Sequence, residues 1–449
     1  MPHFGFEEAA PALMYYSGVL AFFLSIFWRP IFGLFYLVPL IPLQTVRYWM
    51  HPFPFGQSVQ DLMLLSVALG LLRRGEPVFP QTPITKFLGW MTLYTYISLW
   101  LGSILTGSEL PFWIDSPRLV DWKNYMALPL LFWLTAGAVR KKWEMYVLVG
   151  MMLLSTLALN RSFYDSIEGR DMSEFKEENR SEGAMGYAGV NGMAAFEASM
   201  ATVLLALAFF EKNLLLKGVY YLTASFSIYC ILFAFSRGGY LAVLLGLLFL
   251  GVTKKRIILV AFAIFLATWQ EVVPESVIQR VMGTVTSDGN LESSANIRVN
   301  LWDEAMEVFR SNPITGMGVF TYAYRGGKFK NPHNYYVQAL VEGGIIGLFF
   351  FLGNLWLLYR TGYHLFKIGT DPFFQSIGLA LSGWIVCAAG CNFFGDRWTY
   401  FQVCGYLWTL AGMAARATII EEEWAASEAG EEEHEEDEQP VEEPLPLPA

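Results

Sequence analysis

The sequence predicts an all-α polytopic membrane protein, with about 12–13 transmembrane helices and one large helical loop outside the cytoplasm. The chain has 449 residues, of which 54% are hydrophobic. Apolar runs of about 15–23 residues recur along most of it, and a helix of about 20 residues crosses a bilayer. Aromatic residues make up 16% of the chain. Trp and Tyr gather near the ends of the runs, as they do at membrane interfaces.

The predicted spans follow one another along most of the chain. The first six cover residues 12–28, 31–46, 58–72, 84–105, 120–139 and 143–159, and the other seven cover 188–210, 214–235, 240–252, 257–273, 335–359, 374–394 and 399–415. Arg29-Pro30 leaves only a tight turn between the first two, which can therefore form a hairpin that does not fully cross. The start of the chain lacks the basic segment of a secretory signal, so we expect the first span to remain in the mature protein.

Lysine and arginine in the short loops set the expected orientation. Clusters of basic residues all fall on one side, which we take as cytoplasmic: 73–74, 140–142, 212–217, 254–256 and 360–367. Alternation then puts two sizeable loops on the outer face, 160–187 and 274–334. Thirteen spans would place the N-terminus outside, and twelve would place both ends inside.

The last 29 residues form a separate acidic segment, 421–449. This segment holds twelve Glu, one Asp and no Lys or Arg, and leaving it out changes the net charge from −10 to +3. Like-charged blocks of this kind usually stay disordered. We therefore divide the chain into a transmembrane domain, residues 1–420, and an acidic, disordered cytoplasmic tail, with a partner-binding role for the tail as the alternative.

The loop 274–334 is predicted to carry structure of its own. Apolar residues recur at helical spacing from Ile297 to Phe309, which predicts an amphipathic helix over about 294–310. Asn312-Pro313 ends this helix. Gly316-Met317-Gly318 then predicts a turn, and without a preceding strand or a Walker lysine it is only weak evidence for phosphate binding.

The stretch 331–347 joins this polar loop to the next apolar helix. Pro332 disfavours helical geometry at Asn331, and Asn334 is a plausible helix cap. His333 is therefore expected on the first ordered turn at the mouth of the membrane, where an imidazole can reach a substrate at the lipid–water boundary. The alternative is that His333 only solvates a helix end.

Three charged residues near the outer face are further candidates. Arg237 stands between two apolar runs, and charges at membrane depth are usually paired or functional. Arg298 lies on the predicted loop helix, and guanidinium groups suit bidentate phosphate recognition. Glu197, in the outer half of the seventh predicted span, can pair with Arg237 or orient it. The structural alternatives are a snorkelling arginine, an exposed helix arginine and a structural carboxylate.

Other polar residues carry less weight. Asp61 and the Asp396-Arg397 pair are interpreted as structural. The loop 160–187 adds positive charge, but acidic residues of the same loop offset it; its arginines are Arg161, Arg170 and Arg180. The four cysteines all fall in apolar runs, which argues against a disulfide framework or a cysteine metal site. No metal or nucleotide motif occurs in the sequence, so we expect no metal, cofactor or nucleic acid.

Together these motifs resemble the O-antigen ligase family. His333-Asn334, nine residues, Gly344, two residues and Gly347 is similar to the family signature of His, then Asn, Ser or Gln, nine positions, Gly, two positions, Gly. Arg237 to Leu241 resembles the family's Arg-x-x-x-Leu motif, and Ile297 to Gly318 resembles its large extracytoplasmic loop. The resemblance covers about Gly189 to Gly353, whereas the first five spans carry only a generic membrane pattern.

The resemblance implies a GT-C-like, metal-independent glycosyltransferase of the bacterial inner membrane. Such enzymes move a glycan from undecaprenyl pyrophosphate to a hydroxyl on the outer face, usually on the lipid A core. Relatives polymerise O-antigen repeats or attach glycans to protein hydroxyls. On this interpretation His333 is the base, the substrate is bound by Arg237, Arg298, Asn334 and Glu197, and membrane lipids are the other partners.

A transporter is the alternative from a different class, since one branch of the family carries the label bicarbonate transporter. A transporter should show internal repeats and helices broken at mid-membrane. The sequence has no convincing repeat, and its polar residues gather at the outer face. We therefore prefer the glycan ligase, with the polymerase of the same family as the nearer alternative.

Overall fold

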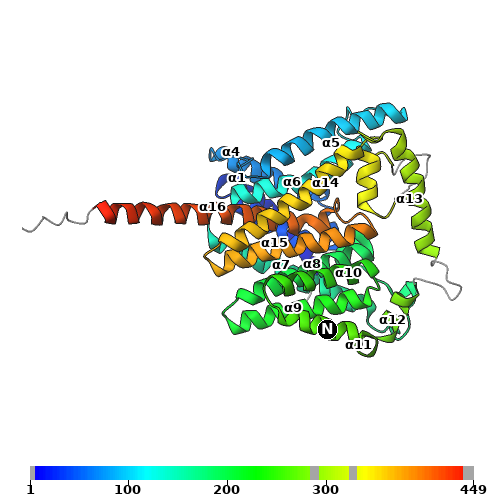
Figure 1. The fold of residues 1–449 in the computed structure, drawn as a ribbon. Helices are drawn as coiled ribbons and strands as arrows, with labels where there is room; N and C mark the ends of the chain where they lie inside the picture. The colour runs from blue at the N-terminus through cyan, green and yellow to red at the C-terminus, as the bar shows by residue number, and fades with distance from the viewer. Residues whose placement is uncertain (1–5, 284–292, 323–330, 438–449) are drawn as a thin grey trace, which may run out of the picture.

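The computed structural model describes residues 6–283, 293–322 and 331–437. Over these residues the chain forms α-helices joined by loops and short 3-10 turns, packed into one bundle (Figure 1). Eight of the described helices are long and apolar enough to cross a membrane, and two bent pairs bring the number to as many as ten. The predicted class, an all-α polytopic membrane protein, is confirmed.

The helices follow the predicted apolar runs closely. The N-terminal part of the chain forms α1 (Phe6–Phe27), α2 (Ile31–Leu37), α3 (Gln44–Arg47), α4 (Val59–Arg73), α5 (Thr85–Thr106), α6 (Pro117–Ala138) and α7 (Lys142–Ile167). The remainder forms α8 (Gly189–Phe210), α9 (Leu214–Phe233), α10 (Arg237–Thr253), α11 (Ile257–Val272), α12 (Glu275–Met282), α13 (Ser293–Ser311), α14 (Tyr335–Ile368), α15 (Pro372–Cys391) and α16 (Phe401–Asp437). Short 3-10 turns relevant below are η2 (Tyr48–Met50), η3 (Gly56–Ser58), η4 (Glu177–Asn179), η5 (Gly183–Ala188) and η7 (Asn392–Phe394).

Each of the thirteen predicted runs contains a helix, but not every run is a straight crossing. The second predicted span is broken, because the segment 44–50 turns away from 31–40 by 115°. Helix α11 and the following α12 form a second bent pair, at 105°. Helices α4 and α10 have only 15 and 17 residues, at or below the lower end of the range of roughly 17–25 residues for a spanning helix. By length and composition, eight to ten of the described helices are candidates for full crossings, against the predicted 12–13.

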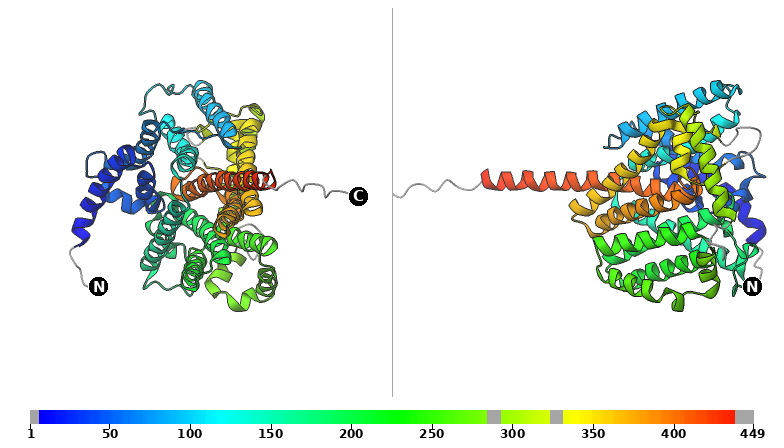
Figure 2. Two further views of the ribbon diagram at one scale, coloured as in Figure 1. Left: turned by 90° about the vertical axis from the view of Figure 1, so that its left-hand side faces the viewer. Right: turned by 45° about the vertical axis from the view of Figure 1, so that its right-hand side comes forward.

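Helices α8, α15 and α16 form the centre of the bundle (Figure 2). Their small residues let the backbones approach closely, as is usual between helices in membranes. Gly378 of α15, for example, lies so close to α14 that an added Cβ would be 2.5 Å from the carbonyl oxygen of Gly362. Large side chains fill the remaining space, and Trp384, Trp398 and Trp408 are almost completely buried.

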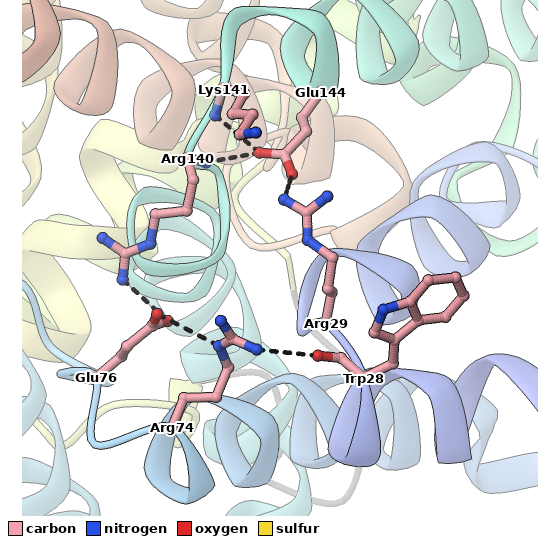
Figure 3. A network of polar contacts seen from close by, with 7 residues as sticks. All are labelled: Trp28, Arg29, Arg74, Glu76, Arg140, Lys141 and Glu144. Carbon is pink, nitrogen blue, oxygen red and sulfur yellow. Dashed lines mark hydrogen bonds and ion pairs between the residues drawn. The ribbon is translucent and has the colours of Figure 1, made fainter.

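An ionic network ties three loops together at the end of the bundle from which α16 projects (Figure 3). The wholly buried Glu144 accepts hydrogen bonds from the backbone nitrogens of Arg140 and Lys141, at 2.6 and 2.9 Å, and pairs with Arg29. Glu76 pairs with Arg140 at 3.0 Å. Removing one member of such a buried pair leaves a costly unpaired charge. These basic residues therefore have a structural role, in addition to indicating the cytoplasmic side of the membrane.

Helix α13 lies across the opposite end of the bundle from the projecting part of α16 (Figure 1). The loop helix predicted over 294–310 is thus confirmed. The chain differs from the expected disordered tail, because α16 stays helical through Asp437. Glu and Ala favour helix, and a helix already formed in the bundle extends without a new nucleation step. Residues 438–449 lie outside the described part of the chain.

Candidate functional site

The turn between α9 and α10 places Arg237 at the start of a helix. Phe235 takes a left-handed conformation, with φ of 51°, and reverses the chain. The Ser236 side chain caps α10 by accepting a hydrogen bond from the backbone nitrogen of Gly239 at 3.4 Å. Arg237 is therefore the first residue of α10, where the helix dipole also favours a negative ligand.

Arg237 lines a pocket of about 130 Å³, which we call the arginine pocket. Five arginines from five segments surround it: Arg180, Arg237, Arg280, Arg298 and Arg397. The other lining residues are Glu177, Asn191, Ser236, Gly238, Cys391 and Phe394. Since Glu177 is the one acidic residue in this lining, the pocket carries a large excess of positive charge.

Two of these arginines hold the α9–α10 turn in place. The Nε of Arg180 donates to the carbonyl oxygen of Ala234 at 3.2 Å, and the Nε of Arg280 donates to that of Phe235 at 3.1 Å. Glu177 pairs with both arginines, at 3.1 and 3.4 Å. The turn that presents Arg237 is thus built from charged groups, which fix its position at the edge of the pocket.

The loop between α15 and α16 supplies Arg397. Its Nη1 donates to the carbonyl oxygen of Asp396 at 2.7 Å. The Asp396 carboxylate accepts hydrogen bonds from the backbone nitrogens of Trp398 and Thr399, at 2.9 and 3.0 Å. Asp396 is therefore structural, as the sequence indicated, but its neighbour Arg397 belongs to the pocket.

His333 is held in an unusual backbone conformation just before α14. Its φ is 50°, in the left-handed region that few residues other than glycine adopt. The Asn331 side chain accepts from the backbone nitrogen of His333 at 2.7 Å, and Trp302 of α13 donates to the carbonyl oxygen of Pro332 at 2.7 Å. Asn334 then caps α14 by accepting from the nitrogens of residues 336 and 337, so its predicted capping role is confirmed.

The imidazole of His333 interacts electrostatically with two arginines of the arginine pocket. His333 is exposed, but partial desolvation by the surrounding protein and repulsion of the protonated ring by Arg298 and Arg397 lower its pKa below the usual value of 6.5. A lower pKa leaves the ring neutral at pH 7, ready to accept a proton. This electrostatic coupling connects the histidine to two arginines that line the pocket.

A kink in α14 pairs this helix with a segment of the preceding loop. Gly344 has φ of 61°, and the helix is broken there. The freed nitrogens of Ile345 and Ile346 donate to the carbonyl oxygens of Pro313 and Ile314, at 2.9 and 3.3 Å. In return, Val341 and Glu342 accept from the nitrogens of residues 317 and 318. The segment 313–318 is thus paired with the kink.

The family model described as O-antigen ligase matches residues 222–352. This segment of the chain is O-antigen ligase-like. It runs from α9 to the middle of α14 and includes Arg237, Arg298 and His333. A comparison with curated proteins finds no match. The predicted resemblance to this family is confirmed. The matched segment contains His333 and both arginines that the sequence singled out, Arg237 and Arg298.

Two arginines of the pocket lie outside the O-antigen ligase-like segment, namely Arg180 and Arg397. Sequence reasoning gave Arg180 little weight because acidic residues surround it, and interpreted Arg397 as structural. Arg280, inside the segment, was not singled out. The sequence did contain evidence that Arg180 and Arg397 could lie near Arg237, because all three fall on the predicted outer side of the membrane. The other arginines of the loop 160–187 have local partners, Asp165 and the carbonyl oxygen of Glu178.

Glu197 lies away from the arginine pocket. It is wholly buried in α8, where the Asn160 amide, in the orientation that satisfies both groups, donates to its two oxygens at 2.9 and 3.1 Å. Asn160 also accepts from Ser227 Oγ at 3.2 Å. Glu197 thus joins α7, α8 and α9, and the structure does not bring it to the lining of the pocket. We therefore do not include Glu197 among the proposed substrate-binding residues.

Glycines 238 and 239 allow close approach of neighbouring protein. A Cβ on Gly239 would lie 2.8 Å from the Cβ of Ala194, and one on Gly238 would lie 3.1 Å from that of Phe394. The four cysteines are free and buried. Among the described residues, no group of three His, Cys, Asp or Glu side chains is placed to hold a metal ion.

Proposed function

We propose that this O-antigen ligase-like protein transfers a glycan from undecaprenyl pyrophosphate to an acceptor hydroxyl, on the outer face of the bacterial inner membrane. The observation that carries the proposal is the arginine pocket with His333 electrostatically coupled to it. A pyrophosphate leaving group needs positive charge, and an attacking hydroxyl needs a base. The pocket supplies the first and the histidine supplies the second.

The arginine pocket suits the pyrophosphate of the donor. Guanidinium groups bind phosphate oxygens in pairs of parallel hydrogen bonds, and five of them line the same small pocket. As the bond between the sugar and the pyrophosphate breaks, the leaving oxygen keeps the electron pair. Positive groups already in place stabilise this developing charge without reorganisation. Because arginines supply the charge, the proposed reaction calls for no metal or cofactor.

His333 acts as the general base in this proposal. The oxygen of the acceptor hydroxyl attacks the anomeric carbon of the sugar, and the imidazole takes the proton that the hydroxyl loses. A histidine with a lowered pKa is neutral at pH 7 and can perform this step, which is typically worth roughly 10²–10⁴-fold in rate. The acceptor is a sugar of the lipid A core, or the growing glycan itself if the protein is a polymerase.

Exchange of Arg237 for lysine tests the pyrophosphate site. The variant Arg237→Lys keeps the charge but loses the planar fork, so we expect transfer to fall by roughly 10–100-fold, the loss of about 1.5–3 kcal/mol of charge-assisted hydrogen bonding. The matched control is Arg161→Lys, since Arg161 pairs with Asp165 at the surface. Transfer at the wild-type rate in both variants would remove Arg237 from the site.

A further inference from the structure

A second and larger cavity lies beside the arginine pocket, with a volume of about 410 Å³. We call it the amide cavity because seven Asn and Gln side chains line it, among them Gln44, Gln57, Asn124 and Gln338. This volume lies within the range of roughly 300–1,000 Å³ that is typical of small-molecule sites. Most of its lining lies outside the O-antigen ligase-like segment, on α3, α4, α6, η2, η3, η5, the loop between α15 and α16 and the start of α16.

The amide cavity has an exposed aromatic rim and a buried polar floor. Tyr48 and Tyr187 at the rim are 45% and 72% exposed. Gln44 and Gln402, which also line the cavity, are buried. The amide of Gln44 donates to Tyr48 and accepts from the backbone nitrogen of Tyr187. By contrast, Gln57 and Asn124 are exposed on the lining, where their amides can donate to and accept from a polar ligand.

The amide cavity meets the arginine pocket at two places in the chain. Asn331 lines the cavity, and its side chain accepts from the backbone nitrogen of His333 at 2.7 Å. Asp396 lines the cavity, while the next residue, Arg397, lines the arginine pocket. The two sites are therefore neighbours along the chain at both places, although His333 itself lines neither.

The two sites differ sharply in charge. The arginine pocket has five arginines and one glutamate in its lining. The amide cavity has three acidic residues, Asp121, Glu342 and Asp396, against one arginine and one histidine, Arg47 and His51. The cavity therefore lacks the positive excess that would attract a phosphorylated or acidic sugar, and its amides favour an uncharged one.

We infer that the amide cavity binds uncharged sugar residues of the glycan at the point of transfer. The inference deepens the proposed function and rests on it for the reaction that the cavity serves. The bound sugars belong either to the donor, next to its pyrophosphate, or to the acceptor that presents the hydroxyl. Both sources share the same chemistry, a ring bearing several hydroxyl groups and no charge.

Direct binding to the full-length protein in nanodiscs tests the inference. Saturation-transfer NMR is recorded with glucose, galactose and N-acetylglucosamine as uncharged probes and with glucuronic acid as the charged counterpart. We expect the uncharged sugars to give transfer signals and glucuronic acid to give a much weaker one. A wild-type protein that binds none of the uncharged probes, or binds glucuronic acid equally well, would overturn the inference.

A double variant connects the binding to the cavity. Gln57→Ala with Asn124→Ala removes two exposed lining amides, so folding should be unaffected. Sugar affinity should fall roughly tenfold or more, given two lost hydrogen bonds of ordinary strength. The matched control is Gln270→Ala, an exposed amide at the end of α11 that does not line the cavity. Equal losses in both variants, or none in either, would contradict the assignment.

Two further measurements separate this inference from the proposed function. Inorganic pyrophosphate should bind the double variant normally and bind Arg237→Lys weakly. If the uncharged sugars bind and pyrophosphate does not, the proposed function fails and the sugar site stands; the reverse result overturns the sugar site alone. In the transfer reaction, the double variant raises the KM for the donor if donor sugars occupy the cavity, and for the acceptor if acceptor sugars do. A variant with both KM values unchanged would overturn the inference.

Discussion

His333 combines a strained backbone conformation with a side chain whose pKa is lowered. Its left-handed conformation is costly for a residue other than glycine, and contacts from Asn331 and Trp302 to the same short segment maintain it. Such strain at an electrostatically perturbed residue is common at functional sites. The arginines that would bind the donor also lower the pKa of His333, so one set of charges serves binding and proton transfer.

The pH dependence of transfer follows from this coupling. Because the pKa of His333 is lowered, kcat/KM should decline only as the pH falls below about 6.5, where the free enzyme's histidine becomes protonated. Arg298→Gln removes a repelling charge and raises this pKa, so the acidic limb should move to higher pH. Arg310→Gln, an exposed arginine at the end of the same helix, is the control. A limb that stays in place in Arg298→Gln would separate His333 from the titration.

At the scale of elements, the glycines of the signature act through the backbone. The kink at Gly344 exposes nitrogens and carbonyl oxygens of α14, and the segment 313–318 pairs with them. Tyr94 of α5 adds a hydrogen bond to the carbonyl oxygen of Gly343 at 2.5 Å. This junction ties the segment 313–318 and α5 to the part of α14 that follows His333.

Adjacent glycines provide a test of the junction. A Cβ at Gly344 would lie 2.2 Å from the carbonyl oxygen of Ile314, in a left-handed backbone, whereas a Cβ at Gly343 meets nothing closer than 3.8 Å. Gly344→Ala should therefore destabilise the protein by about 1–3 kcal/mol and abolish most transfer, and Gly343→Ala should be tolerated. Thermal unfolding and transfer rates of the two variants check this. Similar behaviour of both would show that the kink is not required.

The sequence predicted the helices well because long apolar runs report directly on burial in a membrane. Residues 335–359 and 374–394, for example, both lie within described helices. It could not predict that Arg180 and Arg397 meet at one pocket, because their convergence depends on packing between segments distant in the chain. From the run of like charges alone, the sequence also predicted a disordered tail beginning at Glu421. In the structure α16 continues through Asp437, because Glu and Ala favour helix. The amide cavity likewise arises mostly from segments outside the signature stretch 331–347.

At the scale of the whole molecule, the two ends of the bundle differ in a way that fits opposite sides of a membrane. Helix α13 lies at one end, and α16 projects from the other (Figures 1 and 2). The arginine pocket is lined by Arg298 of α13. The basic network around Glu144 lies at the end of the bundle from which α16 projects. The proposed orientation puts this network and the acidic helix in the cytoplasm and the pocket outside.

Reporter fusions test this orientation. A reporter that is active only outside the cytoplasm should work when fused after Gly283, beyond α12, and should fail when fused at Lys254 or Glu431. The reason is the bias of lysine and arginine toward the cytoplasmic side. The reverse pattern would place His333 in the cytoplasm, where an outer-face transfer is impossible.

The central claim is that His333 removes the proton from the acceptor while arginines hold the donor pyrophosphate. The most direct measurement compares transfer and donor binding in the single variant His333→Ala. If His333 is the base, transfer should fall by roughly 10²–10⁴-fold, while the protein remains folded and binds the lipid-linked donor with unchanged affinity. Transfer near the wild-type rate, or loss of donor binding together with transfer, would contradict the claim.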